Sequence, residues 1–152
     1  MHARLAEPDD IPQIVSGAEI FAQEAWWGFT FDPQKALDMI EAFMTHPLAA
    51  LLVIDDGAST ICAGALISLE PGFCVENFGH VGYFFVIPAY RRTRASRQLL
   101  QAIDDWMAAM GAAAVMAGGT ANLSARESRQ LTKLFRKAGY EVAGDALVKR
   151  SL

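Results

Sequence analysis

The sequence predicts a single mixed α/β (α+β) domain in which helices flank one sheet. Its 152 residues suit one domain, and no repeat, low-complexity segment or linker divides them. Strand-like apolar runs and stretches with apolar residues three or four apart follow the order β-α-α-β-β-β-α-β-α-β-β. Antiparallel hairpins combined with one β-α-β unit are typical of a mixed sheet. We therefore expect residues 1–152 to fold as one domain.

The N-terminal half is expected to hold three strands and two helices. Pro8-Asp9-Asp10-Ile11-Pro12 is typical of a helix start, with acidic residues and an early proline, and Asp32-Pro33 starts a second helix. Asp55-Asp56-Gly57 separates two apolar runs, as a hairpin turn does. The expected strands are residues 1–6, 49–54 and 60–69, and the expected helices are residues 8–25 and 33–46.

The C-terminal half is expected to contain the β-α-β unit. Glu70-Pro71-Gly72 ends the third strand, and the residues up to Gly79 fit either a loop or a strand edge. Gly139 follows the last helix, where a left-handed C-cap residue is common. The remaining expected elements are a strand at 81–87, a helix at 93–111, a buried strand at 113–117, a helix at 124–138 and short strands at 140–142 and 147–152.

Composition excludes several classes of protein. No apolar stretch reaches the ~20 residues that span a bilayer, and the first ten residues lack the apolar core of a signal peptide. Cys62 and Cys74 have no CxxC or histidine-spaced partner, so neither a metal site nor a disulfide is expected. We therefore expect a cytoplasmic protein with two reduced thiols, no metal and no membrane partner.

An arginine-rich loop joins the strand at 81–87 to the helix that follows it. The chain has a net charge of −4, so this basic cluster does not follow from overall composition. The first turn of a helix offers unpaired N–H groups, and arginine offers a planar fork of donors; both favour phosphate. The arginines are Arg91, Arg92, Arg94 and Arg97. The loop predicts a phosphate-containing ligand, the alternative being a solvated basic helix start.

Four stretches in the same order resemble the GNAT superfamily of acyl-CoA-dependent N-acyltransferases, and the resemblance covers nearly the whole chain. They are residues 7–15, the hairpin at 55–65, the block Phe85-Val86-Ile87-Pro88-Ala89-Tyr90-Arg91, and residues 134–140. The resemblance implies a mostly antiparallel central sheet and acetyl-CoA as co-substrate. It also implies a primary amine of a small molecule or peptide as acceptor, and a homodimer.

The family's pyrophosphate loop runs Arg/Gln-x-x-Gly-x-Gly/Ala. The corresponding residues here are Arg91-Arg92-Thr93-Arg94-Ala95-Ser96. Arg91 matches, whereas Arg94 stands in place of the first glycine and Ser96 in place of the second small residue. Glycine lets backbone approach a diphosphate with no side chain between them. We therefore expect Arg94 either to point outward or to contact a phosphate itself.

The resemblance assigns further binding residues on both sides of this loop. It implies that backbone groups of Phe84, Phe85 and Val86 line the pantetheine and polarise the thioester carbonyl. Asn122 is implied to hydrogen-bond the pantetheine arm, the alternative being a turn or cap residue.

A general base is not evident at the positions that the family uses. The glutamate of many members is replaced here by Gly82. His80 and Glu76 lie nearby, and histidine exchanges protons near neutral pH. Glu24 lies beside the region where acceptors enter in the family. Each candidate has a plainer alternative, a half-exposed histidine at a strand start or a solvated carboxylate.

The general acid is also displaced from its usual position. The family's tyrosine in the last helix is replaced by Phe135, which has no proton to donate. Tyr83 on the motif strand and Tyr90 are the substitutes, with core packing as the alternative for Tyr83. Trp26 and Trp27 are adjacent and cannot both face inward on a helix, so one could line an acceptor pocket or a dimer contact.

Three functions remain in order of preference. The first is transfer of an acetyl group from acetyl-CoA to an amine by direct attack in a ternary complex. The second is a GNAT-fold module that binds CoA or a protein partner with weak or no catalysis. The third, nucleic-acid binding through the arginines, is disfavoured by the acidic net charge and by the expected absence of a basic face beyond the arginine loop. No nucleic-acid partner is therefore expected.

Overall fold

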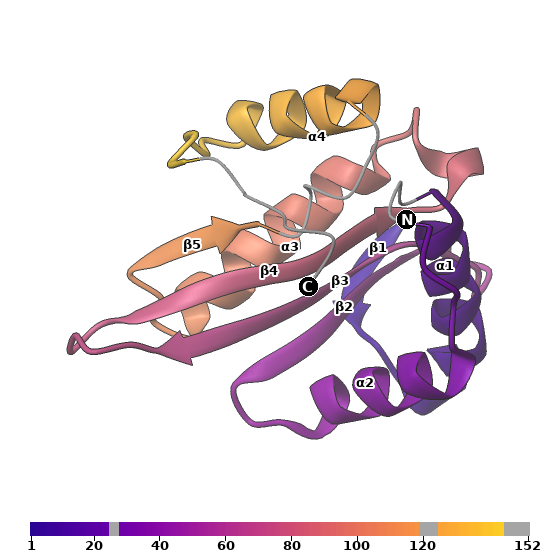
Figure 1. Ribbon diagram of the computed structural model, residues 1–152, viewed down its shortest axis with the longest axis horizontal. Coiled ribbons are helices and arrows are strands. Elements are labelled where there is room, and N and C mark those ends of the chain that lie inside the picture. Colours follow the sequence, from indigo (N-terminus) through magenta and orange to yellow (C-terminus); the bar gives the residue numbers. More distant parts are fainter. Residues whose placement is uncertain (25–27, 119–124, 145–152) are drawn as a thin grey trace.

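The computed structural model of the chain describes residues 1–24, 28–118 and 125–144 (Figure 1). Five strands lie side by side in the order β1-β2-β3-β4-β5; the first four are antiparallel to their neighbours, and β5 runs parallel to β4. The strands are β1 (His2–Leu5), β2 (Ala49–Asp55), β3 (Ile61–Pro71), β4 (Asn77–Val86) and β5 (Ala114–Ala117), and the α-helices are α1 (Ile11–Glu24), α2 (Pro33–Thr45), α3 (Ala95–Ala109) and α4 (Ala125–Lys137). Short 3-10 turns at Pro8–Asp10 and Pro88–Tyr90 precede α1 and α3.

Helices cover both faces of the sheet, so the core has two parts. On one face α1 and α2 bury Ile14 and Ile40 against the strands. On the other face α3 buries Leu99 and Ile103, and Phe135 of α4 joins the same cluster. β2 and β3 lie between these layers and are almost wholly buried, which explains why both read as continuous apolar runs rather than alternating ones.

Local signals in the sequence account for the helix starts. The Oδ1 atom of Asp32 accepts hydrogen bonds from the backbone N–H groups of Gln34 and Lys35, at 3.0 and 3.1 Å, and Pro33 occupies the first turn of α2. At the start of α3, Thr93 caps the helix: its Oγ1 atom accepts a hydrogen bond from the backbone N–H of Ala95, at 3.2 Å.

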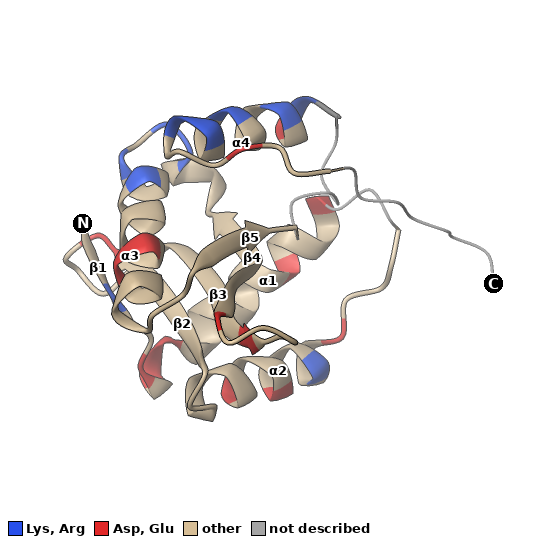
Figure 2. Ribbon diagram, turned by 90° about the vertical axis from the view of Figure 1, so that its left-hand side faces the viewer, with Lys and Arg blue, Asp and Glu red and all other residues tan. Residues whose placement is uncertain are grey.

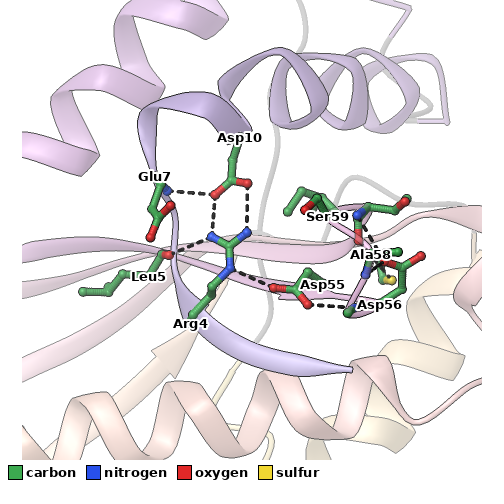
Figure 3. Close-up of polar contacts among 12 residues, drawn as sticks. Arg4, Leu5, Glu7, Asp10, Asp55, Asp56, Ala58 and Ser59 are labelled. Carbon is green, nitrogen blue, oxygen red and sulfur yellow. Dashed lines mark hydrogen bonds and ion pairs between the residues drawn. The ribbon is translucent and has the colours of Figure 1, made fainter.

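An ion-pair network ties β1 to β2 and to the turn before α1 (Figure 3). The guanidinium of Arg4 donates to both carboxylate oxygens of Asp10, at 2.6 and 2.9 Å, and its Nε donates to Asp55 at 2.8 Å. Both carboxylates are nearly buried. Hydrogen bonding to Arg4 therefore lowers the pKa of Asp10 and of Asp55 below the ordinary aspartate value.

The fold class and the element order are confirmed up to α4, and three details differ from expectation. β4 begins at Asn77, because residues 77–80 pair with β3 and β5 despite a glycine, Gly79, in this stretch. β5 was expected to be buried, but its side chains alternate between exposed and half-buried, and Met116 is 53% exposed. Residues 140–144 form no strand, and the strand expected at 147–152 lies outside the described residues.

Within the described residues, no helix is long and apolar enough to cross a membrane. In the same residues, no group of histidine, cysteine and acidic side chains is arranged to hold a metal ion. Cys62 is buried and Cys74 exposed, and both are free thiols.

Candidate functional site

Two cavities meet at the side chains of Phe21 and Phe85, which line both of them. The first has a volume of about 890 Å³ and lies between the end of β4, α1, α4 and the loop before α3. The second, about 510 Å³, lies between α1, α2 and the sheet. Described residues of the first cavity are Gly17, Ile20, Phe21, Glu24, Phe84–Ala89, Arg91, Arg92, Ser96, Arg126, Glu127, Gln130, Leu131 and Leu134.

The sheet opens along β4 beside the first cavity. Pairing between β4 and β5 covers Phe78 to Val81 only, so beyond Val81 the described strands leave one edge of β4 without a partner strand. Here the β3 register shifts, since Ile67 pairs with Val81 and Leu66 with Tyr83. Gly82 is the extra residue of this bulge, and a bulge bends a strand and changes its pairing. The bulge at Gly82 therefore lies where the described pairing of β4 with β5 ends.

Backbone groups of two predicted residues lie on this open edge. The N–H of Ile87 donates to the carbonyl of Cys62 on β3, at 2.9 Å. Residues of an antiparallel pair point their N–H and C=O groups alternately toward and away from the partner. Phe85 therefore faces β3 like Ile87, whereas the backbone groups of Phe84 and Val86 face the open edge. The carbonyl of Val86 accepts a hydrogen bond from Nε of Arg91, at 3.1 Å.

Three arginines from two distant segments line the first cavity. Arg91 and Arg92 come from the loop before α3, and Arg126 comes from the first turns of α4. Ser96, in the first turn of α3, also lines the cavity. The cavity thus combines guanidinium groups and a helix N-terminus, both of which favour phosphate. Arg126 was not predicted as a site residue from the sequence, because only the tertiary fold brings α4 close to this loop.

The other loop residues expected to bind phosphate lie differently. Arg94 occupies the N-cap position of α3, and it is not among the described residues that line either cavity. The side chain of Ala95 is fully buried, and its N–H is bound to Thr93. Thr93 also donates its hydroxyl to the carbonyl of Tyr90, at 2.7 Å. Thr93 and Ala95 therefore shape the helix start.

A basic surface extends from this loop along α4 (Figure 2). The sequence was expected to have no basic face beyond the arginine loop, but α4 carries five exposed basic side chains. These are Arg126, Arg129, Lys133, Arg136 and Lys137. With the four arginines of the loop, nine of the 13 lysines and arginines of the chain belong to these two segments. Their spacing of three or four residues along one helix was the signal available in the sequence.

Of the four candidate catalytic side chains, Glu24 is the one that lines the first cavity. Its carboxylate accepts a hydrogen bond from Arg91, with 2.5 Å between the Glu24 Oε2 and Arg91 Nη2 atoms. The side chain is 27% exposed and that of Arg91 39%. Glu24 is the last residue of α1 and lies one turn beyond Phe21, so it stands close to the boundary of the two cavities.

His80 and Glu76 are not among the described residues lining either cavity. The Nδ1 atom of His80 lies 3.4 Å from a carboxylate oxygen of Glu70 on β3. His80 precedes Phe84 by four residues, roughly 13 Å along a strand. Glu76 is exposed in the β3–β4 turn, beside Phe73 and Val75.

Tyr83 lines the second cavity rather than the first. Its ring packs edge-on against Phe21, with 5.7 Å between the ring centroids, and the residue is 38% exposed. Phe135 is buried between Phe84 and Tyr140, at centroid distances of 5.3 and 5.0 Å. Asn122, Trp26 and Trp27 lie outside the described residues.

Comparison with known proteins places these features in a family. No curated protein sequence matches the chain. Among solved structures, a transcriptional regulator from Bacillus halodurans has a TM-score of 0.81 at 11% identity, covering 97% of each chain. An integron cassette protein from the mobile metagenome of Cole Harbour Salt Marsh has a TM-score of 0.78 at 23% identity, covering 99% of this chain and 90% of its own.

An aminoglycoside N-acetyltransferase solved in complex with CoA has a TM-score of 0.76 at 15% identity, covering 99% of this chain and 93% of its own. At such identities these structures establish the fold. The sequence itself matches the model of the "Acetyltransferase (GNAT) family" over residues 18–140, a span that includes β4, the arginine loop and α4. The chain therefore belongs to the acetyltransferase (GNAT) family, whose acyl donor is acetyl-CoA.

Proposed function

We propose that this protein transfers the acetyl group of acetyl-CoA to a primary amine of a small molecule or peptide. The observation that carries the proposal is the open edge of β4, which lies beside a cavity lined by three arginines. Acetyl-CoA supplies an acetyl thioester; the amine nitrogen bonds to the carbonyl carbon while the carbon–sulfur bond breaks and the thiolate leaves.

The residues of the first cavity fit the two halves of this donor. Arg91, Arg92 and Arg126 suit the phosphates, because guanidinium groups form charge-assisted hydrogen bonds with phosphate oxygens. Phe84 and Val86 suit the pantetheine and thioester, since their peptide groups face the open edge next to an apolar wall. An N–H aimed at the thioester oxygen would stabilise the charge that develops there.

Glu24 is the side chain that we assign to the amine. It lines the first cavity beside Phe21, and its carboxylate can accept the proton that the nitrogen loses, directly or through water. His80, Glu76 and Tyr83 stay predictions, and none of them lines this cavity. The departing thiolate would take its proton from water, because the described lining of the first cavity holds no tyrosine, histidine or cysteine.

The same lining favours one alternative, a GNAT-fold protein that binds CoA with weak catalysis. Glu24 is bound to Arg91, and the described lining of the first cavity holds no tyrosine, histidine or cysteine that could protonate the leaving thiolate. Both functions require CoA binding, but only the first requires turnover.

Thermal unfolding with and without excess acetyl-CoA tests the shared requirement, with CoA and ATP as comparison ligands. A ligand at about 100 times its Kd stabilises the fold by about 2.7 kcal/mol, which moves the midpoint by several degrees. Thiol release from acetyl-CoA in a screen of amines then tests turnover. A shift with acetyl-CoA and CoA but not ATP, together with acetylated product, supports acetyl transfer; a shift without product from any amine supports the binding module instead.

A further inference from the structure

The second cavity differs in chemistry from the first and is adjacent to it. The two share Phe21 and Phe85, so these two rings lie at the boundary between the cavities. Its volume of about 510 Å³ lies in the range of small-molecule sites. Its walls come from α1, α2, the sheet and residues 29–31, and the arginines that line the first cavity are not in its described lining.

Aromatic and aliphatic side chains make up most of the described lining of this cavity. Five rings contribute, and those of Phe21 and Tyr83 already pack edge-to-face. Tyr83 stands out in this respect because it is 38% exposed on a strand that is otherwise largely covered. An aromatic ring placed beside these edges would bury apolar surface and could add ring–ring contacts of about 0.5–1.5 kcal/mol each.

The described lining contains only two charged side chains, Asp32 and Lys35. Asp32 already accepts the N–H groups of Gln34 and Lys35 as the cap of α2, and Lys35 is itself positive. A polycation would therefore meet one occupied carboxylate and one like charge. Burying several ammonium groups without paired carboxylates is strongly unfavourable, so this cavity does not suit a polycationic acceptor.

A single primary amine on an aromatic body suits it better. The body would occupy the second cavity, while the amine would extend past Phe21 toward Glu24 and the open edge of β4. The neutral form of the amine is the one that attacks a thioester, and the Glu24 carboxylate could take the proton that the amine loses.

We propose that the second cavity binds the aromatic end of the acceptor, and that the acceptor is a small arylalkyl amine rather than a polycationic aminoglycoside. This inference rests on the proposed acetyl transfer. The amine nitrogen gains the bond to the acetyl carbon, the thioester carbon–sulfur bond breaks, and the amine proton passes to Glu24 or water.

The test uses 2-phenylethylamine as probe and the aminoglycoside neamine as its polycationic counterpart. Binding of each to the CoA-saturated protein is measured by calorimetry, and acetyl transfer by product mass. Ala22 lines the second cavity, and its neighbour Gln23 is exposed on α1 and lines neither cavity. Ala22→Phe therefore fills the cavity, and Gln23→Phe is the matched control with the same side chain on the same helix.

We expect 2-phenylethylamine to bind and to be acetylated, neamine to do neither, and Ala22→Phe to weaken amine binding at least tenfold. The midpoint shift with CoA should survive in both variants, which shows that they fold and keep the first cavity. Absence of 2-phenylethylamine binding, binding that Ala22→Phe leaves unchanged, or acetylation of neamine in its place would overturn the inference while acetyl transfer stands. Acetyl-CoA that neither shifts the midpoint nor yields product with any amine would instead overturn the proposed function.

Discussion

The carboxylate of Glu24 at the end of α1 is bound to the guanidinium of Arg91, 67 residues further along the chain. This pair connects α1, which lines both cavities, with the arginine loop that we propose binds phosphate. A phosphate and Glu24 would compete for the same arginine donors. Binding of the donor at Arg91 would therefore release the carboxylate that we assign to the amine.

Glu24→Gln should tighten CoA binding by about two- to fivefold at low salt, because it removes a partly exposed ion pair worth up to about 1 kcal/mol. Turnover should fall at the same time if Glu24 accepts the amine proton. Calorimetry with CoA and steady-state rates measure the two effects separately. Glu19→Gln, on the exposed side of α1, is the control. An unchanged CoA affinity would show that Glu24 does not compete with phosphate.

Arg91→Ala and Arg126→Ala should each weaken CoA binding about tenfold, the value of one charge-assisted hydrogen bond. Arg97→Ala is the control, because this exposed residue of the same cluster is not in the described lining. Arg91→Lys should restore little, since a lysine lacks the fork that reaches the Val86 carbonyl and a second acceptor together. Equal losses in all three alanine variants would indicate general electrostatic attraction rather than a phosphate site.

The sequence predicted the arginine loop but not which of its residues face the cavity. Arg91 and Arg94 have the same side chain, so residue type does not tell them apart. Because α3 begins at Ala95, Arg94 occupies its N-cap position. Arg126 was missed because its approach to Arg91 depends on how α4 packs through Phe135 onto Phe84. The sequence gives the chemistry of each side chain directly. Which side chains line a cavity between distant elements depends on how those elements pack.

The strands likewise differ in how well the sequence predicted them. The apolar runs of β2 and β3 identified them directly, because both faces are buried. β4 was placed four residues too late, since Phe78 and Gly79 follow a turn-like stretch and owe their strand conformation to pairing with β3 and β5. Apart from Gly82, no residue type in the sequence indicates that the edge of β4 is open beyond this point.

Gly64→Ala should destabilise the fold by about 1–3 kcal/mol and also weaken ligand binding. A Cβ atom at Gly64 would lie 2.7 Å from two atoms of the Phe85 ring, and one at Gly17 would lie 2.8 Å from the same ring. The ring is thus held between β3 and α1, and it lines both cavities. Chemical unfolding and CoA titration measure the two effects. Gly144→Ala, where a Cβ meets nothing within 4 Å, is the control; equal behaviour of the two variants would contradict this packing.

Arg4→Met should destabilise the fold near neutral pH by about 2–3 kcal/mol, because Asp10 and Asp55 would keep their buried charges without a partner. Arg129→Met, an exposed position on α4, should change stability little. Hydrogen bonds from Arg4 lower the pKa of both aspartates, so their contribution is complete well above the unfolded value of about 3.9.

That contribution should be lost as the pH falls below about 4, through the lowered folded pKa values. Below this pH the stability of Arg4→Met rises relative to that of the wild type. Its unpaired buried carboxylates take up protons more readily, which removes their uncompensated charge. The difference in unfolding free energy between the two proteins should therefore shrink from pH 6 to pH 3. Denaturant titrations at each pH measure it, and a difference that stays constant would mean that Arg4 stabilises the fold by packing rather than by charge.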